Sequence, residues 1–163
     1  EIKEYDWSSD VCSSDLMRGL SFMLLLLALV GHAGPTDAAA KVRYFYADLV
    51  SDEETFPVES KGKGHAEFVL DLETLRLTWK VTFSGLTSKA TGVKIHGPAQ
   101  MFTNGVPVVD MAPKGVTNPL EGSAVIEEAL VQYILSTWAY INISTEKYKD
   151  GEIRGQVDGK GLE

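Results

Sequence analysis

The stretch LRLTWKVTF, residues 75–83, decides the fold class that this sequence predicts. Apolar and polar side chains alternate along its whole length, so that Trp79 lies on one face and Lys80 on the other. A period of two is typical of a β-strand with one face in the core and the other in water. The residues expected to face the core are Leu75, Leu77, Trp79, Val81 and Phe83.

The surrounding sequence continues this pattern. HAEFVLDL at 65–72 alternates as well, and the short connection at 72–74 predicts an antiparallel hairpin between the two strands. Pro107 favours an edge position or a strand start for the strand-like run that contains it. The further strand-like runs occupy residues 42–49, 92–96, 106–111, 137–145 and 152–157. Short strands separated by Gly and Pro predict an all-β sandwich or barrel.

One segment departs from the period of two. In AVIEEALVQYIL at 124–135, Ile126, Leu130 and Ile134 recur at helical spacing, and Ser123 precedes them as a candidate N-cap. We therefore expect one short helix near 124–135 within the all-β fold.

The N-terminal part of the chain has the character of a targeting segment. Residues 17–40 begin with a methionine and Arg18, continue with an apolar run at 20–30 and end in small residues. This order predicts a secretory signal peptide that is cleaved after Ala33 or within Ala38–Ala40. The apolar run has about eleven residues and a membrane span needs about 20, so we expect no membrane span in the mature chain.

The remaining features predict one secreted domain in an extracellular or periplasmic space. Residues 1–16 look like one reading frame of a sequencing-library adaptor and are predicted to be non-native; they contain Cys12, the single cysteine. A domain at 41–158, followed by a tail at 159–163, is therefore expected to lack disulfides. The acidic balance, a net charge of −8, argues against a nucleic-acid partner.

Several motifs occur in an order that resembles the CHRD domain, the module named after chordin. After the hairpin come KIHGPA at 94–99, YINIST at 140–145 and GEIRGQV at 151–157. The resemblance covers about residues 42–158. It implies a Greek-key β-sandwich, either immunoglobulin-like or superoxide-dismutase-like, in a secreted microbial-type single-domain member. The implied role is a non-catalytic binding or structural domain, with an unknown extracellular protein or glycan as partner.

The chain departs from the family pattern where a metal site is conceivable. The family commonly has His-Ile-His-Gly where this chain has Lys94, Ile95, His96 and Gly97, and a histidine where it has Ser144. Two histidines at alternate strand positions share a face, as copper and zinc sites use them. Lys94 places a cation there instead. We therefore expect no metal and no cofactor, and the alternative of a metal-binding or redox domain is weakened.

His96 is the first of six candidate binding residues. Its imidazole is expected to be structural, hydrogen-bonded near the Gly97-Pro98 turn. The alternatives are a place in a binding surface, or a role as a metal ligand or a catalytic base. Lys94 shares its strand face. Asn142 and Ser144 belong to the motif YINIST and form a glycosylation sequon, N-I-S.

Glu152 and Arg154 complete the candidate set. They lie two residues apart on one predicted strand and would form either a ligand clamp or a structural pair. Gly151 and Gly155 beside them are expected to serve a turn with positive φ and a close packing point.

Exposed aromatic residues raise a further alternative, an extracellular carbohydrate- or matrix-binding module. Strict alternation leaves four aromatic residues that cannot all lie in the core: Tyr44, Tyr46, Trp138 and Tyr148. If they line one exposed face, they would favour such a surface over packing beneath loops. The acidic loop at 51–60 is expected to be solvated, or less favourably to bind calcium, with Phe56 as its one buried residue.

Overall fold

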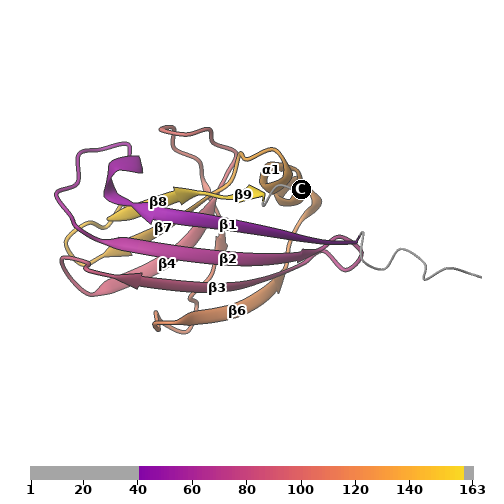
Figure 1. Cartoon of the computed structure of the whole chain (residues 1–163), viewed down its shortest axis with the longest axis horizontal. Helices are drawn as coiled ribbons and strands as arrows, with labels where there is room; N and C mark the ends of the chain where they lie inside the picture. Colours follow the sequence, from indigo (N-terminus) through magenta and orange to yellow (C-terminus); the bar gives the residue numbers. More distant parts are fainter. Residues whose placement is uncertain (1–40, 160–163) are drawn as a thin grey trace, which may run out of the picture. The chain divides into compact units, whose positions relative to one another are not determined.

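The computed structural model describes residues 41–159. The predictions for the leader at 1–16, the signal peptide at 17–40 and the end of the tail at 160–163 lie outside this range. The elements in chain order are β1 (Val42–Val50), η2 (Ser51–Glu53), β2 (Lys63–Asp71), β3 (Arg76–Ser84), β4 (Ala90–His96), β5 (Pro107–Asp110), β6 (Leu120–Val125), α1 (Glu128–Leu135), β7 (Tyr140–Thr145), β8 (Ile153–Gln156) and β9 (Asp158–Gly159) (Figure 1).

The strands form one antiparallel sheet that curls into two layers. Its hydrogen-bonded order is β5-β4-β7-β8-β1-β2-β3-β6, and β9 pairs with β1. The layers meet where β1 pairs with β8 at Val50–Arg154 and with β9 at Phe45–Gly159 and Tyr46–Asp158. Because β3–β4 and β6–β7 connect across the layers, many sheet neighbours are not consecutive in the chain, as in a Greek key. The prediction of an all-β fold with one short helix is confirmed.

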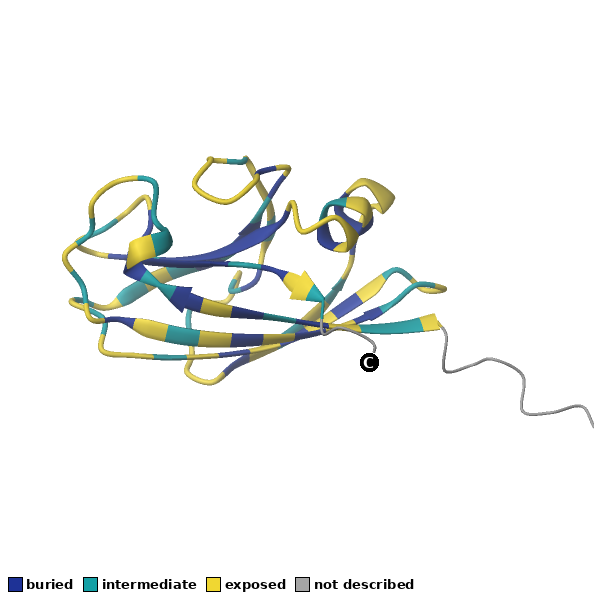
Figure 2. Ribbon diagram, turned by 45° about the horizontal axis from the view of Figure 1, so that its top comes forward, coloured by how far each residue is buried: buried dark blue, intermediate teal, exposed yellow. Residues whose placement is uncertain are grey.

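The hairpin predicted around residues 65–83 forms the centre of one layer. β2 and β3 pair along their whole length, and Phe68 lies opposite Trp79. Buried and exposed residues alternate along both strands (Figure 2). The buried members that face the core are Ala66, Phe68, Leu70, Leu77, Trp79 and Val81.

The turn of this hairpin is longer than predicted. Leu75 has a φ of 53° and lies in the turn, so the strand begins at Arg76 and the prediction that Leu75 belongs to it is wrong. Leu75 is half-buried and packs against the edge of the core. Phe83, at the other end of the predicted strand, is also half-buried.

The segment expected as a helix at 124–135 divides into two elements. Its start belongs to β6, in which Ser123 pairs with Thr78 of β3. α1 begins at Glu128, its N-cap is Glu127, and no side chain caps it. The predicted cap at Ser123 is therefore wrong, because β3 offers a hydrogen-bonding edge that this segment completes. Leu130 and Ile134 of α1 are buried, as their spacing predicted.

The edge strand β5 and the C-terminal strand β9 can be compared with the sequence predictions. β5 starts at Pro107 and stands at one end of the strand order, so the predicted position at an edge or a strand start is confirmed. At the C-terminal end, Asp158 and Gly159 pair with Tyr46 and Phe45. Gly159, the first residue of the predicted tail, is therefore part of the sheet.

Two glycines have the roles that the sequence predicted. Gly151 has a φ of 145°, and a Cβ there would lie 2.2 Å from Nδ2 of Asn142. At Gly155 a Cβ would lie 2.4 Å from the backbone oxygen of Asp48, so only glycine allows β8 to approach β1 this closely.

Candidate functional site

The candidate site lies on the face of β4, β7 and β8 that points away from the core. Two rows of side chains cross this face, since facing residues of paired strands share a side. The first row contains Lys94, Asn142 and Arg154, and the second contains His96, Tyr140 and Gln156. Lys94 and His96 come from β4. Val93 and Ile95, which alternate with them along this strand, are buried in the core.

The acidic loop at 51–60 covers part of this face. Glu53 Oε2 accepts a hydrogen bond of 3.3 Å from the backbone N–H of Gln156, and Glu54 Oε1 accepts one of 3.0 Å from Nδ2 of Asn142. The loop is thus fastened to the sheet rather than freely solvated. Phe56, predicted to be buried, is 66% exposed, because the loop folds with its acids toward the sheet.

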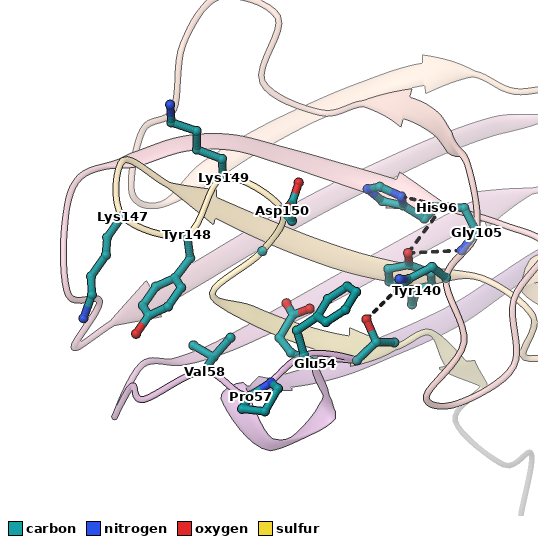
Figure 3. Close-up of a pocket in the computed structure, with 14 residues that line it drawn as sticks. Glu54, Pro57, Val58, His96, Gly105, Tyr140, Lys147, Tyr148, Lys149 and Asp150 are labelled. Atoms are coloured by element: carbon teal, nitrogen blue, oxygen red, sulfur yellow. Dashed lines mark hydrogen bonds between the residues drawn. The ribbon is translucent and has the colours of Figure 1, made fainter.

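A cavity of about 550 Å³ opens beside this loop (Figure 3). Its walls are residues 54–58 and 147–151, and its floor contains His96, Asn104, Gly105 and Tyr140. Volumes of this size are typical of pockets for small ligands. The cavity therefore brings together segments that lie far apart in the sequence.

His96 and Tyr140 form the rigid part of the floor. Their rings stack at a centroid distance of 4.9 Å. Nδ1 of His96 donates a hydrogen bond of 3.0 Å to the Gly105 carbonyl oxygen, and the Gly105 N–H donates to the Tyr140 hydroxyl at 3.3 Å. The imidazole thus holds the loop between β4 and β5, as predicted, although its partner is Gly105 rather than the Gly97-Pro98 turn.

The surroundings of His96 keep its ring neutral. Burial lowers the pKa of His96, and the positive charges of Lys94 and Arg154 lower it further, against the opposing effect of the bond to Gly105. With Nδ1 carrying the proton, Nε2 keeps a free lone pair that can accept a hydrogen bond.

Arg154 lies beneath the site and is almost completely buried. Its Cζ atom is 3.5 Å from the centroid of the Tyr140 ring, and Nη2 donates to the Gln100 carbonyl oxygen at 3.3 Å. It forms no direct ion pair with a carboxylate of the described residues. The structural pair with Glu152 that the sequence allowed is absent, because Glu152 bonds instead to the hydroxyls of Ser60, Thr87 and Thr145.

Glu54 is the perturbed acid of the site. Burial raises its pKa to about 7, although the charge of Arg154 and the hydrogen bond from Asn142 lower it; Asp150 and Glu53 raise it further. Oε1 accepts the bond from Asn142. Oε2 receives no hydrogen bond from the described residues and remains available at the cavity wall.

The structure brings together only some of the predicted site residues. His96 lines the cavity, and Asn142 and Arg154 support it from below, whereas Lys94 and Ser144 do not line it. Glu152 belongs to a separate hydrogen-bond network. Asn142 is buried and its amide donates to Glu54 and to the Asp150 carbonyl oxygen, so the folded domain has no room for a glycan on this sequon.

Sequence analysis missed the residues that form most of the walls. Glu54, Phe56 and Asp150 were not singled out as site residues. The available signal was an acidic run followed, after Thr55, by an aromatic residue and a proline, which is unusual for a purely solvated loop. The aromatic residues that were singled out do not share one face: Tyr44 and Tyr46 lie on β1, Trp138 precedes β7, and among these four only Tyr148 lines the cavity.

Two further properties concern residues 41–159. No three His, Cys, Asp or Glu side chains in this range lie close enough together to hold a metal ion. No helix in the same range has the length and apolar character that crossing a membrane requires.

We expect His96→Ala to lower the free energy of unfolding by about 1–2 kcal/mol. The Gly105 carbonyl oxygen loses its hydrogen bond of 3.0 Å from the imidazole and keeps only the longer one of 3.4 Å from the Tyr140 hydroxyl. The matched control is His65→Ala, since His65 bonds Asp48 at 2.7 Å but both side chains are exposed. This control should change stability by less than about 0.5 kcal/mol. Urea denaturation measures both values, and equal losses would contradict a structural role for His96.

We expect the purified protein to bind no stoichiometric copper or zinc and to lack dismutase activity. The reason is the donor set: His96 shares its strand face with Lys94, whose ammonium group repels a divalent ion. Mass spectrometry of the metal content tests this. Stoichiometric metal that disappears in His96→Ala would show that the imidazole is a ligand.

We expect Glu54→Gln to raise the melting temperature at pH 8 and to leave it unchanged near pH 4.5. A folded-state pKa of about 7, above the ordinary value of 4.5, means that the folded chain holds this proton more tightly than the unfolded chain. The stability of the wild type therefore falls as the pH rises from 4.5 through the folded-state pKa of about 7. Glu59→Gln, at an exposed position of the same loop, is the control. A lower melting temperature of Glu54→Gln at pH 8 would contradict the prediction.

Comparisons with known proteins agree with the motif order described above. The CHRD domain profile matches residues 45–157, which is well over half of the chain. Searches of curated proteins and of solved structures found no significant match. The matched range runs from β1 to the residue after β8 and includes every element of the cavity. The chain therefore belongs to the CHRD domain family.

Proposed function

We propose that this protein is a secreted, non-catalytic binding domain that uses the cavity beside His96 and Tyr140 to hold its ligand. One observation carries the proposal: a cavity of about 550 Å³ combines an exposed aromatic ring with polar groups that have free hydrogen-bonding capacity. Pockets that bind small ligands have this composition. Burial makes the ionised carboxylate of Glu54 energetically unfavourable in this wall. Groups with strongly shifted pKa values concentrate at functional sites.

The non-catalytic part of the proposal rests on the family and on the geometry. CHRD domains are in general not enzymes. Nδ1 of His96 is engaged by a backbone carbonyl, and no hydroxyl of the described residues hydrogen-bonds to the ring. A general base that activates a nucleophile needs such a contact. The donor set also gives no support to the metal-binding or redox alternative.

Secretion is a proposal from the sequence. Residues 17–40 would direct export and be removed, residues 1–16 would be non-native, and the domain would act in an extracellular or periplasmic space. N-terminal sequencing of protein recovered from outside expressing cells tests this. A first residue at Gly34 or within 39–41 supports the proposal, and retention of residues 17–40 in exported protein contradicts it.

The binding role can be tested with a mixed library of sugars, amino acids, short peptides, polyamines and nucleosides. Saturation-transfer NMR should detect at least one compound whose signal is lost in Val58→Trp, which fills the cavity from one wall. Val69→Trp, on the outer face of β2, is the matched control and should bind normally. If no compound distinguishes these two variants, the cavity is not a binding site.

A further inference from the structure

The hydrogen-bonding groups of the cavity are mainly acceptors. Nε2 of neutral His96 and Oε2 of Glu54 have free lone pairs, as described above. The exposed carboxylate of Asp150 stands on the opposite wall and receives no hydrogen bond from the described residues (Figure 3). A ligand that satisfies these atoms must itself bring several hydrogen-bond donors.

The charges around the cavity do not favour an ionic ligand. Two acidic residues, Asp150 and Glu54 with its pKa of about 7, share the walls with two ammonium groups, Lys147 and Lys149. Nζ of Lys147 lies 4.8 Å from the centroid of the Tyr148 ring, and both lysine side chains extend away from the floor (Figure 3). The opposite charges offset one another in part, so neither a cation nor an anion gains a large net attraction.

Buried charge beneath the floor adds to this selection. Arg154 lies under the Tyr140 ring, and its positive charge contributes to keeping His96 neutral. An ammonium ligand at His96 would meet the same positive potential. A carboxylate or phosphate ligand would instead face Glu54. Neutral hydroxyl groups avoid both penalties and can still donate to every free acceptor.

The apolar part of the wall suits a ring with C–H groups on one face. Phe56 is 66% exposed, although the loop that carries it is fastened to the sheet through Glu53 and Glu54. Its ring lines the cavity next to Pro57 and Val58. An aromatic ring held in this way offers a large apolar surface at little entropic cost on binding.

We propose that the cavity binds a neutral sugar, one pyranose unit of an extracellular glycan. The C–H face of the sugar ring packs on Phe56, and its hydroxyl groups donate to Glu54, Asp150 and Nε2 of His96. This inference rests on the proposed binding function and names the ligand of the same site. It does not depend on the aromatic residues of β1, which lie on another face.

The test uses calorimetric titration of the purified protein with neutral oligosaccharides, namely cellopentaose, xylopentaose, laminaripentaose and mannopentaose. Oligogalacturonate and oligomeric chitosan serve as anionic and cationic probes. We expect at least one neutral probe to bind with a Kd below about 1 mM. Phe56→Ala and Glu54→Gln should each weaken that binding by at least about tenfold, since each removes one favourable contact.

Matched variants separate loss of the site from loss of the fold. Phe102→Ala removes an aromatic ring of similar exposure outside the cavity, and Glu59→Gln removes an exposed carboxylate from the same loop. Both should bind the neutral probe normally. Glu54→Gln is expected to be at least as stable as the wild type at pH 8, so its weaker binding would not reflect unfolding.

The outcomes distinguish this inference from the function on which it rests. If no neutral sugar binds but another class of compound is lost in Val58→Trp, the sugar assignment is wrong and the binding function stands. If nothing binds, both are wrong. Neutral-sugar binding that survives Phe56→Ala and Glu54→Gln, or tighter binding of a charged probe, also overturns the sugar assignment.

Discussion

Trp79→Ala should unfold this domain or bring it close to unfolding. The Trp79 side chain is 5% exposed at the centre of β3, opposite Phe68 of β2. A Cβ on Gly122 of the neighbouring strand β6 would lie 2.8 Å from the indole ring, so the ring packs directly against the backbone of Gly122. Truncation of a buried aromatic residue costs about 3–5 kcal/mol. The total free energy of unfolding of a domain is only about 5–15 kcal/mol.

Lys80→Ala is the matched control for this prediction. Lys80 follows Trp79 directly but faces water, and its ion pair with Glu121 at 3.3 Å joins two exposed side chains. Surface pairs of this kind contribute little, so the expected change is below about 0.5 kcal/mol. Chemical denaturation of the two variants measures the difference. Similar losses would mean that the face of β3 has been assigned wrongly.

Glu152→Ala should be the second most damaging change. The side chain is fully buried and accepts four hydrogen bonds: from Ser60 Oγ at 2.6 Å, the Thr87 N–H at 2.7 Å, Thr87 Oγ1 at 2.9 Å and Thr145 Oγ1 at 2.7 Å. These donors come from the β1–β2 connection, the β3–β4 connection and the end of β7. The substitution leaves them without their acceptor, and each buried unsatisfied group costs about 1–3 kcal/mol. We expect a loss of at least about 3 kcal/mol.

The pH dependence of this loss provides an independent check. Burial raises the pKa of Glu152, but the hydrogen bonds from Ser60, Thr87 and Thr145 outweigh it, so the pKa lies below its ordinary value of 4.5. A lowered folded-state pKa stabilises the domain above pH 4.5, and this contribution disappears as pH falls through the folded-state value. The gap between wild type and Glu152→Ala should therefore narrow in acid.

Glu146→Ala is the control, because Glu146 is an exposed acid just after β7. This substitution should alter the free energy of unfolding by less than about 0.5 kcal/mol, both above and below pH 4.5. Glu152→Gln should lose less than Glu152→Ala, since the amide oxygen retains part of the acceptor role. A Glu152→Ala variant as stable as Glu146→Ala would show that the network contributes nothing.

Much of the fold could be predicted from sequence because alternation is a local property. Each residue of β2 and β3 faces the core or water according to its own polarity, so the buried face of the hairpin follows directly from the order of residues. The edge position of Pro107 has the same local origin, because a proline cannot donate to a sheet ladder. The roles of Gly151 and Gly155 were predictable for a comparable reason, namely the lack of a side chain.

The failures share a different origin. The start of AVIEEALVQYIL fits both periods, and only the free edge of β3 decided that Ser123 belongs to a strand. Leu75 fits the alternation, but the hairpin needs it in the turn. In both cases a partner in space, not the local pattern, selected the conformation.

The sequence alone determined that this chain is a β protein, most of its strands although not β6, and, through its motifs, the CHRD family. Only the tertiary structure decided the site. Glu152 meets partners 92 and 65 positions away, and Glu54 meets Asn142 from a distance of 88 positions. A carboxylate in a polar loop looks solvated in the sequence, because no local pattern records which surface the loop will cover. The surface that the loop covers buries Glu54 and so raises its pKa. Because the acids of the loop face that surface, Phe56 is left exposed at the cavity.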